Sequence, residues 1–155
     1  MLLRLPLILL FVASLFSDTK DVFTQIVDLE RKPKTSMDEY VKEVKQIKNF
    51  IIKNEKSDEQ KAYEIFSYAF YHFLNLYDFE FLLKWSEKFL KNRKIKKDIS
   101  LLYYIQIRIF NSQNNTEMLS KIFKETDKMK QGKLLNSINE IQNWYKTNKG
   151  KLNQF

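Results

Sequence analysis

Glycine and proline are scarce in this sequence. Its 155 residues include only two glycines, Gly132 and Gly150, and two prolines, Pro6 and Pro33. Strand-rich folds need many of these residues, because turns between strands rely on the freedom of glycine and the fixed φ angle of proline. Helices joined by polar turns need far fewer. The sequence therefore predicts an all-α protein, and its 44% of hydrophobic residues is enough to build a core.

The first seventeen residues, MLLRLPLILLFVASLFS, have the pattern of a secretory signal peptide. Arg4 precedes an apolar run from Leu5 to Phe16, and the small residues Ala13, Ser14 and Ser17 lie where a signal peptidase could cut. As a helix this run would span only about 18 Å, whereas the hydrocarbon core of a membrane is about 30 Å thick. We therefore expect residues 1–17 to be removed and the mature protein to be exported, either to a periplasm or out of the cell. A membrane anchor and a buried helix are the alternatives.

Amphipathic segments with recognisable start signals fill the rest of the chain. Helices are predicted over residues 19–31, 36–51, 57–76, 78–90, 98–110, 114–129 and 133–147. Two capping boxes are predicted, Ser36 with Glu39 and Ser57 with Gln60. Further helix starts are predicted at Asp18, Asp78, Asp98 and Asn114, and Gly132 is placed to end the sixth helix.

The predicted helices recur with a regular period. The first, third and fifth begin near residues 19, 58 and 98, which is a spacing of about 40 residues and is typical of stacked helical hairpins. The sequence thus predicts about three antiparallel hairpins, stacked as in an α-solenoid, with the last helix as a C-terminal cap. We expect one domain over residues 18–149 and a disordered tail over 150–155.

The middle hairpin, AYEIFSYAFYHFLNLYDFEFLLKWSEKFL (62–90), resembles a tetratricopeptide repeat. The first helix of that family has, in this order, a small residue, an aromatic residue, a leucine, a glycine, an alanine and a tyrosine. In this hairpin the corresponding positions hold Ala62, Tyr63, Phe66, Ser67, Ala69 and Phe70. The acidic-aromatic opening of the family's second helix is matched by Asp78 and Phe79, and Trp85, Phe89 and Leu90 continue the pattern in part. The hairpin departs from the family by an insertion around residues 74–76, and by Leu82 and Phe89 in place of two alanines.

This resemblance implies a scaffold that binds another protein. Carried over by position, the inner groove of such a repeat would be lined by Lys61, Glu64, Tyr68, Tyr71 and His72. The core of the hairpin would contain Phe66, Phe70, Phe73, Phe79, Trp85 and Phe89. The alternative for the groove residues is a half-buried face that a neighbouring helix covers.

Basic residues outnumber acidic ones, and they concentrate in one run. The net charge is +8 for the whole chain, and it falls to +7 when Arg4 leaves with the signal. The run KNRKIKK contains Lys91, Arg93, Lys94, Lys96 and Lys97. These residues are candidates for contact with a polyanion, although such runs also occur as solvent-facing helix ends. In an exported protein we expect that polyanion to be anionic lipid or wall polymer, and not nucleic acid.

The sequence lacks the residues that several common kinds of catalytic and ligand-binding site require. There is no cysteine, His72 is the only histidine, and no glycine-rich loop is available to cradle a phosphate. We therefore expect no enzymatic activity, no cofactor or metal, and no small-molecule substrate. The leading hypothesis is a non-enzymatic scaffold for another envelope or secreted protein. The alternative is a basic protein that contacts an anionic surface through Lys91–Lys97.

Overall fold

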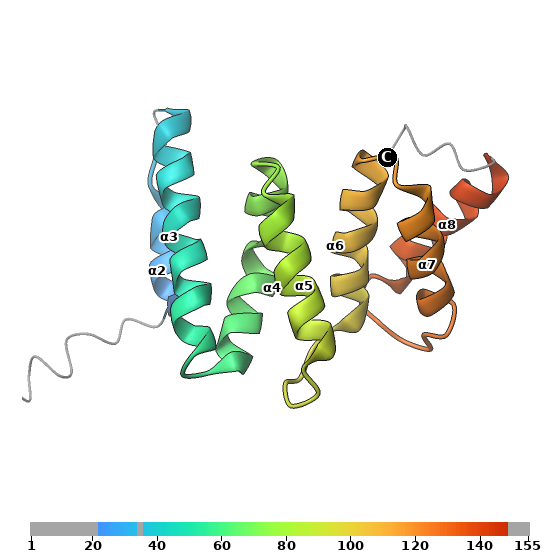
Figure 1. Cartoon of the computed structure of the whole chain (residues 1–155). Coiled ribbons are helices and arrows are strands. Elements are labelled where there is room, and N and C mark those ends of the chain that lie inside the picture. The colour runs from blue at the N-terminus through green and yellow to red at the C-terminus, as the bar shows by residue number, and fades with distance from the viewer. Residues whose placement is uncertain (1–21, 34–35, 149–155) are drawn as a thin grey trace, which may run out of the picture. The chain divides into compact units, whose positions relative to one another are not determined.

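The computed structural model describes residues 22–33 and 36–148, and these ranges are helical without any strand (Figure 1). This confirms the predicted all-α fold. The helices are α2 (Val22–Arg31), α3 (Met37–Glu55), α4 (Glu59–Asn75), α5 (Phe79–Lys91), α6 (Ile99–Ser112), α7 (Thr116–Thr126) and α8 (Leu135–Thr147). None of the described helices is long and apolar enough to cross a membrane. The predicted signal peptide, 1–17, and the predicted tail, 150–155, lie outside the described residues.

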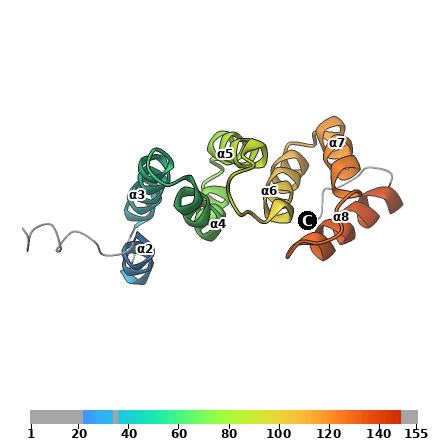
Figure 2. The same ribbon diagram turned by 90° about the horizontal axis from the view of Figure 1, so that it is seen from below.

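The chain divides into two compact units at a boundary within α3, with one unit ending at Phe50 and the other starting at Ile51. In the first unit α2 lies beside α3 (Figures 1 and 2), and Ile26, Val44 and Ile47 are buried. The side chain of Ser36 accepts a hydrogen bond from the Glu39 backbone N–H at 3.3 Å, as a capping residue should. That a single domain covers 18–149 remains a prediction.

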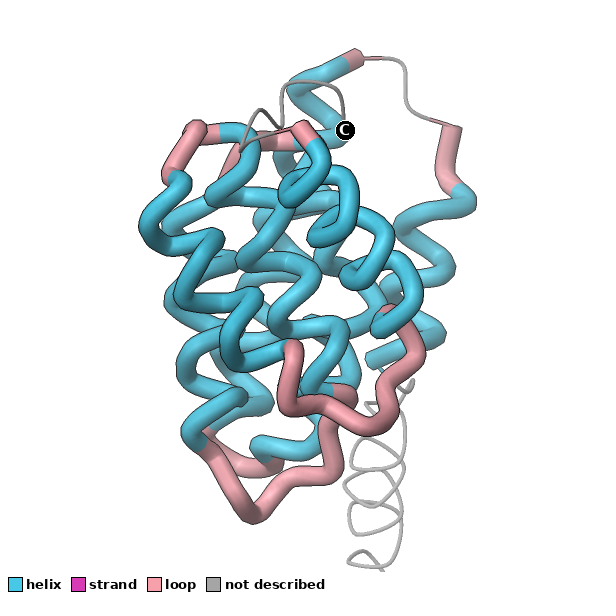
Figure 3. Tube along the Cα trace, turned by 90° about the vertical axis from the view of Figure 1, so that its right-hand side faces the viewer, coloured by secondary structure: helices cyan, strands magenta, loops and turns pink. Residues whose placement is uncertain are grey.

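The second unit consists of the hairpins α4–α5 and α6–α7 followed by α8. Each of these helices packs against the next one, and α8 also packs against α6. Loops lie at both ends of the helices (Figure 3). Seen from below, α6 and α7 appear nearly end-on while α8 is seen from its side, so α8 crosses the last hairpin (Figure 2). This arrangement confirms the predicted stack of hairpins with a C-terminal capping helix.

The two hairpins of this unit share one turn geometry. Tyr77 and Asn114, which lie 37 positions apart, both adopt left-handed φ angles, of 55° and 53°. After each of them a backbone N–H reaches back to the first hairpin helix: Asp78 donates to the Phe73 carbonyl at 2.9 Å, and Asn115 donates to Phe110 at 2.8 Å. These two hairpins therefore reverse direction in the same way.

Aromatic rings fill the contact between α4 and α5. Phe89 lies 5.4 Å from Tyr63, 5.3 Å from Phe66 and 5.4 Å from Trp85 between ring centroids. Phe66, Phe73, Trp85 and Phe89 are buried as predicted, whereas Phe70 and Phe79 are only half-buried. Phe81, which the sequence did not assign to the core, is buried and packs 4.8 Å from Phe73. The buried rows on α5 are therefore 81–85–89 and 82–86, spaced by four residues.

A second core joins α6, α7 and α8. It contains Ile107, Phe110, Leu119, Ile122, Phe123, Ile138 and Ile141. The last two residues come from α8, so this helix covers the apolar face that the last hairpin would otherwise expose to water.

Several predicted helix boundaries are wrong by one to four residues. Helix α4 is capped by Asp58, whose side chain accepts from the Lys61 N–H at 3.0 Å, and not by Ser57. Helix α7 is capped by Asn115, because Asn114 occupies the left-handed position of the turn. It also ends at Thr126 and not near Met129. Gly132 therefore does not terminate α7, and its role is described below.

Candidate functional site

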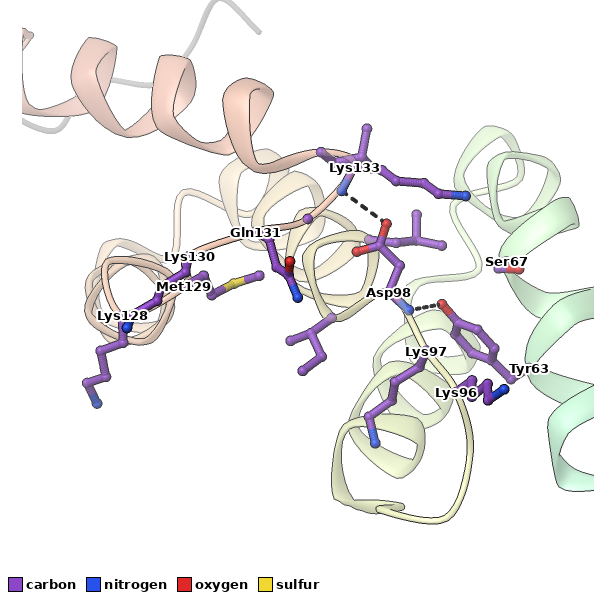
Figure 4. A pocket seen from close by; sticks show the side chains of 14 residues that line it. Tyr63, Ser67, Lys96, Lys97, Asp98, Lys128, Met129, Lys130, Gln131 and Lys133 are labelled. Atoms are coloured by element: carbon purple, nitrogen blue, oxygen red, sulfur yellow. Dashed lines mark hydrogen bonds between the residues drawn. The ribbon is translucent and has the colours of Figure 1, made fainter.

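A hollow of about 1480 Å³ lies at the end of the second unit where α4 and α6 begin. It is lined by the N-terminal half of α4, by the loop between α5 and α6, and by the loop between α7 and α8 (Figure 4). Five lysines line it: Lys96, Lys97, Lys128, Lys130 and Lys133. We call this the basic hollow.

The α5–α6 loop is held in place by α4. The side chain of Gln60 accepts a hydrogen bond from the Lys96 N–H at 2.7 Å and donates one to the Lys96 carbonyl at 3.0 Å. The side chain of Asn92 donates to Glu59 at 2.7 Å, and Ile95 is buried beneath the loop. Because its backbone is fixed in this way, the loop presents Lys96 at a defined position on the rim of the hollow.

Asp98 connects all three parts of the site. Its backbone N–H donates to the Tyr63 hydroxyl oxygen on α4 at 2.6 Å. Its carboxylate accepts from the N–H and the hydroxyl of Ser100, at 3.0 and 2.6 Å, and from the Lys133 N–H at 3.2 Å. Figure 4 shows Asp98 between Tyr63 and Lys133, with one hydrogen bond drawn to each of them. One short side chain thus caps α6 and also anchors the α7–α8 loop.

Gly132 allows the α7–α8 loop to approach α6 closely. A Cβ atom at this position would lie 2.5 Å from the Ser100 Cβ and 2.6 Å from its Oγ, which is closer than real Cβ contacts. The approach brings the Leu134 N–H within 3.0 Å of the Ser100 hydroxyl, to which it donates. Gly132 is therefore needed for space next to Ser100, and this is why a glycine stands in this loop.

Positive charge dominates the basic hollow. Asp98 is the only carboxylate among its lining residues, and it is already hydrogen-bonded by Ser100 and Lys133. Lys97 is half-buried and donates to the Asn92 carbonyl. Burial, and secondarily the charge of Arg93, lower the pKa of the Lys97 amino group. Of the five ammonium groups, that of Lys128 is paired with Glu125 at 2.9 Å. No carboxylate of the described chain pairs with the ammonium groups of Lys96, Lys130 and Lys133, so the site keeps an excess of positive charge, which favours an anionic ligand.

The structure divides the predicted polyanion residues. Lys96 and Lys97 line the basic hollow, whereas Lys91, Arg93 and Lys94 do not. Lys91 lies 3.9 Å from Glu87 in an exposed ion pair on α5. The three lysines of the α7–α8 loop, KMKQGK (128–133), were not among the predicted site residues. They could have been found from the repeat period. In a stack of hairpins, the α5–α6 and α7–α8 loops lie at the same end, so lysines in one loop lie near lysines in the other.

Only some of the predicted groove residues of α4 are exposed to solvent. Tyr68 and Tyr71 are 40% and 42% exposed, Glu64 is also exposed, and Lys61 is half-buried. The placement of His72 in a groove is wrong, because this side chain is only 4% exposed. It continues the buried row formed by Ile65 and Ala69, since positions spaced by four and three residues share one side of a helix.

Replacing Tyr63 with phenylalanine is expected to reduce the loss of stability at alkaline pH. Burial, the largest cause, raises the pKa of Tyr63 above 10, so the folded protein keeps this proton when the unfolded chain has released it. The folded state then binds more protons, and the free energy of unfolding falls as pH rises above about 10. Burial also raises the pKa of Tyr103, so part of this decline should remain in Tyr63→Phe.

Urea unfolding of both proteins at pH 8, 10 and 11 measures this effect. At pH 8 the variant should be less stable by about 1 kcal/mol, since the hydrogen bond from Asp98 is lost. The difference should shrink as pH rises. A constant difference across this range would mean that Tyr63 does not titrate as its environment requires.

Comparisons with known proteins add no assignment to this geometry. No protein family, no curated protein and no solved structure matches the chain. Within the ranges that the structure describes, no group of three or more metal-ligating side chains is brought together. The basic hollow is thus the feature on which a functional hypothesis can be based.

Proposed function

We propose that the protein is an exported, non-enzymatic helical scaffold and that it binds an anionic partner in the basic hollow. The proposal rests on the lining of this concave site. Five lysines from two loops line it, and its single carboxylate, that of Asp98, is already hydrogen-bonded. Concave surfaces with charges of one sign focus the electrostatic potential and attract ligands of the opposite sign. The proposal retains Lys96 and Lys97 of the run Lys91–Lys97 and adds the lysines of the second loop.

The scaffold part of the proposal is supported by the stacked hairpins. Repeats of this kind present extended surfaces and bind partners without catalysis. The resemblance of residues 62–90 to a tetratricopeptide repeat points the same way, and a second envelope or secreted protein is the partner that it implies.

The export part of the proposal rests on residues 1–17, and it is tested separately. N-terminal sequencing of the native protein should find a start after Ser14 or Ser17. An intact Met1 in a cytosolic fraction would overturn export and, with it, the preference for envelope partners.

Removing three lysines of the basic hollow is expected to abolish most of the anion binding. We choose Lys96→Gln with Lys130→Gln and Lys133→Gln, because no carboxylate of the described chain pairs with these three ammonium groups, and glutamine keeps the backbone donors. At about 1 kcal/mol per lysine, binding of poly-L-glutamate should weaken about a hundredfold. Raising the salt concentration should weaken binding to the unmodified protein in the same way, because exposed charges are screened within about 8 Å at physiological ionic strength.

The matched control changes the same net charge elsewhere in the second unit. Lys84, Lys124 and Lys146 are exposed and lie outside the basic hollow. Their replacement with glutamine should weaken binding less than about threefold, through the general field alone. Equal losses in both triple variants, or no binding of poly-L-glutamate by the unmodified protein, would overturn the proposed site.

A second candidate surface is the exposed pair Tyr68 and Tyr71, which favours a protein partner on α4. The same experiment separates the two surfaces when it is extended to crosslinked partners from cells. Tyr68→Ala with Tyr71→Ala should leave partner capture intact if the basic hollow is the site. Loss of partners in this variant alone would move the function to the α4 face, since buried aromatic residues carry much of the energy of protein interfaces.

A further inference from the structure

The side chains and backbone donors of the basic hollow indicate which class of anion it binds. This inference rests on the function proposed above. Three properties matter: how the lysines are distributed, which backbone donors remain, and which apolar side chains lie among the charges.

The lysines are spread along the site and do not converge on one point. Figure 4 shows the side chain of Lys133 extending past Asp98 towards α4, while Lys97 and Lys128 lie on the other side of the site. A compact anion such as phosphate needs donors that converge on it. Separated ammonium groups instead fit a chain that carries several negative charges along its length.

Four backbone donors of the basic hollow are already engaged. The N–H groups of Lys96, Asp98, Lys133 and Leu134 donate to Gln60, Tyr63, Asp98 and Ser100. Tight phosphate sites rely on such N–H groups, because they are short, fixed and directed at the anion. Lysine side chains are long and flexible, so they tolerate the variable spacing of carboxylates on a peptide.

Apolar side chains lie between the lysines. Ile99 is 42% exposed at the start of α6, and Met129 and Leu134 are half-buried nearby in the α7–α8 loop. A purely anionic polymer has nothing to place against these groups. A protein segment can place an apolar side chain there and so remove Ile99 from water.

Size and shape also favour a protein segment. The volume of about 1480 Å³ exceeds the usual 300–1,000 Å³ of small-molecule pockets. A membrane surface is nearly flat over the width of the basic hollow. It can therefore contact side chains at the rim more easily than side chains at the bottom. An extended chain can follow the hollow and contact both lysine-bearing loops together.

We infer that the basic hollow binds an extended acidic segment of a partner protein, with carboxylates against the lysines of both loops and one apolar side chain against Ile99 and Met129. The lysines supply attraction and the apolar contact supplies selectivity for a peptide over other polyanions. The acidic segment is thus recognised by charge and by one apolar anchor.

The test compares two ten-residue peptides of Asp, Glu and Ser that differ only in a central Leu or Ala. The Leu peptide should bind the full-length protein about tenfold more tightly, since it buries more apolar surface. Ile99→Ser should lower the affinity for the Leu peptide to that for the Ala peptide and so remove this difference. Ile52→Ser is the matched control, because Ile52 is 40% exposed on α3 and lies outside the basic hollow. It should preserve the tenfold difference.

The outcomes separate this inference from the function on which it rests. Equal affinities for the two peptides, with poly-L-glutamate still bound through the lysines, would overturn the acidic-segment inference and leave the anion site standing. Tighter binding of polyphosphate or of phosphatidylglycerol vesicles than of a Leu peptide at matched charge would also overturn it. Binding of none of these anions would overturn the proposed function itself.

Discussion

Replacing Phe66 with alanine is expected to lower the free energy of unfolding by about 3–5 kcal/mol, because a large ring is deleted from a site that cannot refill the space. Phe66 is fully buried on α4, and its ring centroid lies 5.3 Å from that of Phe89 on α5. The ring is therefore part of the contact between the two helices of the first hairpin in the second unit. Loss of this contact should destabilise that hairpin directly.

Chemical denaturation of the variant, with Tyr68→Ala as its control, measures the effect of Phe66. Tyr68 is an aromatic residue on the same helix, but it is 40% exposed, so its replacement should cost about 1 kcal/mol or less. Phe70, which is half-buried, should give an intermediate loss. Similar losses for Phe66 and Tyr68 would contradict the division of α4 into a buried and an exposed side.

Gly132→Ala is expected to destabilise the protein by about 2–4 kcal/mol, a large effect for one added methyl group in a loop. The new Cβ would lie 2.5 Å from the Ser100 Cβ, and Ser100 is fully buried in the first turn of α6. The loop must therefore move away. The movement strains the packing and breaks the hydrogen bonds from Lys133 to Asp98 and from Leu134 to Ser100.

A double-mutant cycle tests the cause of this destabilisation. Ser100→Gly removes the two atoms that would lie within 3 Å of the new methyl group, so it should recover part of the loss and give a coupling energy of about 1 kcal/mol or more. Gln131→Ala, an exposed neighbour in the same loop, should change stability by less than about 0.5 kcal/mol. Additive effects of Gly132→Ala and Ser100→Gly would show that close contact with Ser100 does not explain the glycine.

A displaced α7–α8 loop should also weaken the anion site. Asp98 and Ser100 hold the backbone that carries Lys133, and the same loop carries Lys128 and Lys130. Gly132→Ala is therefore expected to reduce the affinity for poly-L-glutamate even though it removes no charge. This links the stability of the loop to the geometry of the basic hollow.

Interactions between near neighbours in the chain were predicted well. The scarcity of glycine and proline, the apolar stripes and the capping side chains indicated the helices and the starting points of α3, α5 and α6. Asp98, for example, caps α6 as its position in the sequence suggested, with its side chain accepting from the Ser100 N–H at 3.0 Å. Such features depend on residues within one or two turns of each other, so the sequence displays them directly. Boundaries next to turns were less accurate, because Asn114 is taken up by the left-handed turn position.

The sequence by itself determined an all-α chain, its helical hairpins and their approximate period, and one of the two loops that form the basic hollow. Only the tertiary structure decided which helix faces are covered, so His72 and Phe81 are buried against expectation. It also decided that Lys133 lies beside Asp98 and Gly132 beside Ser100, although these pairs are more than thirty residues apart in the chain. The physical reason is that helix formation is local, whereas burial and the meeting of loops depend on how successive hairpins stack. Stacking brings corresponding ends of separate hairpins together, and a single window of sequence does not contain both partners.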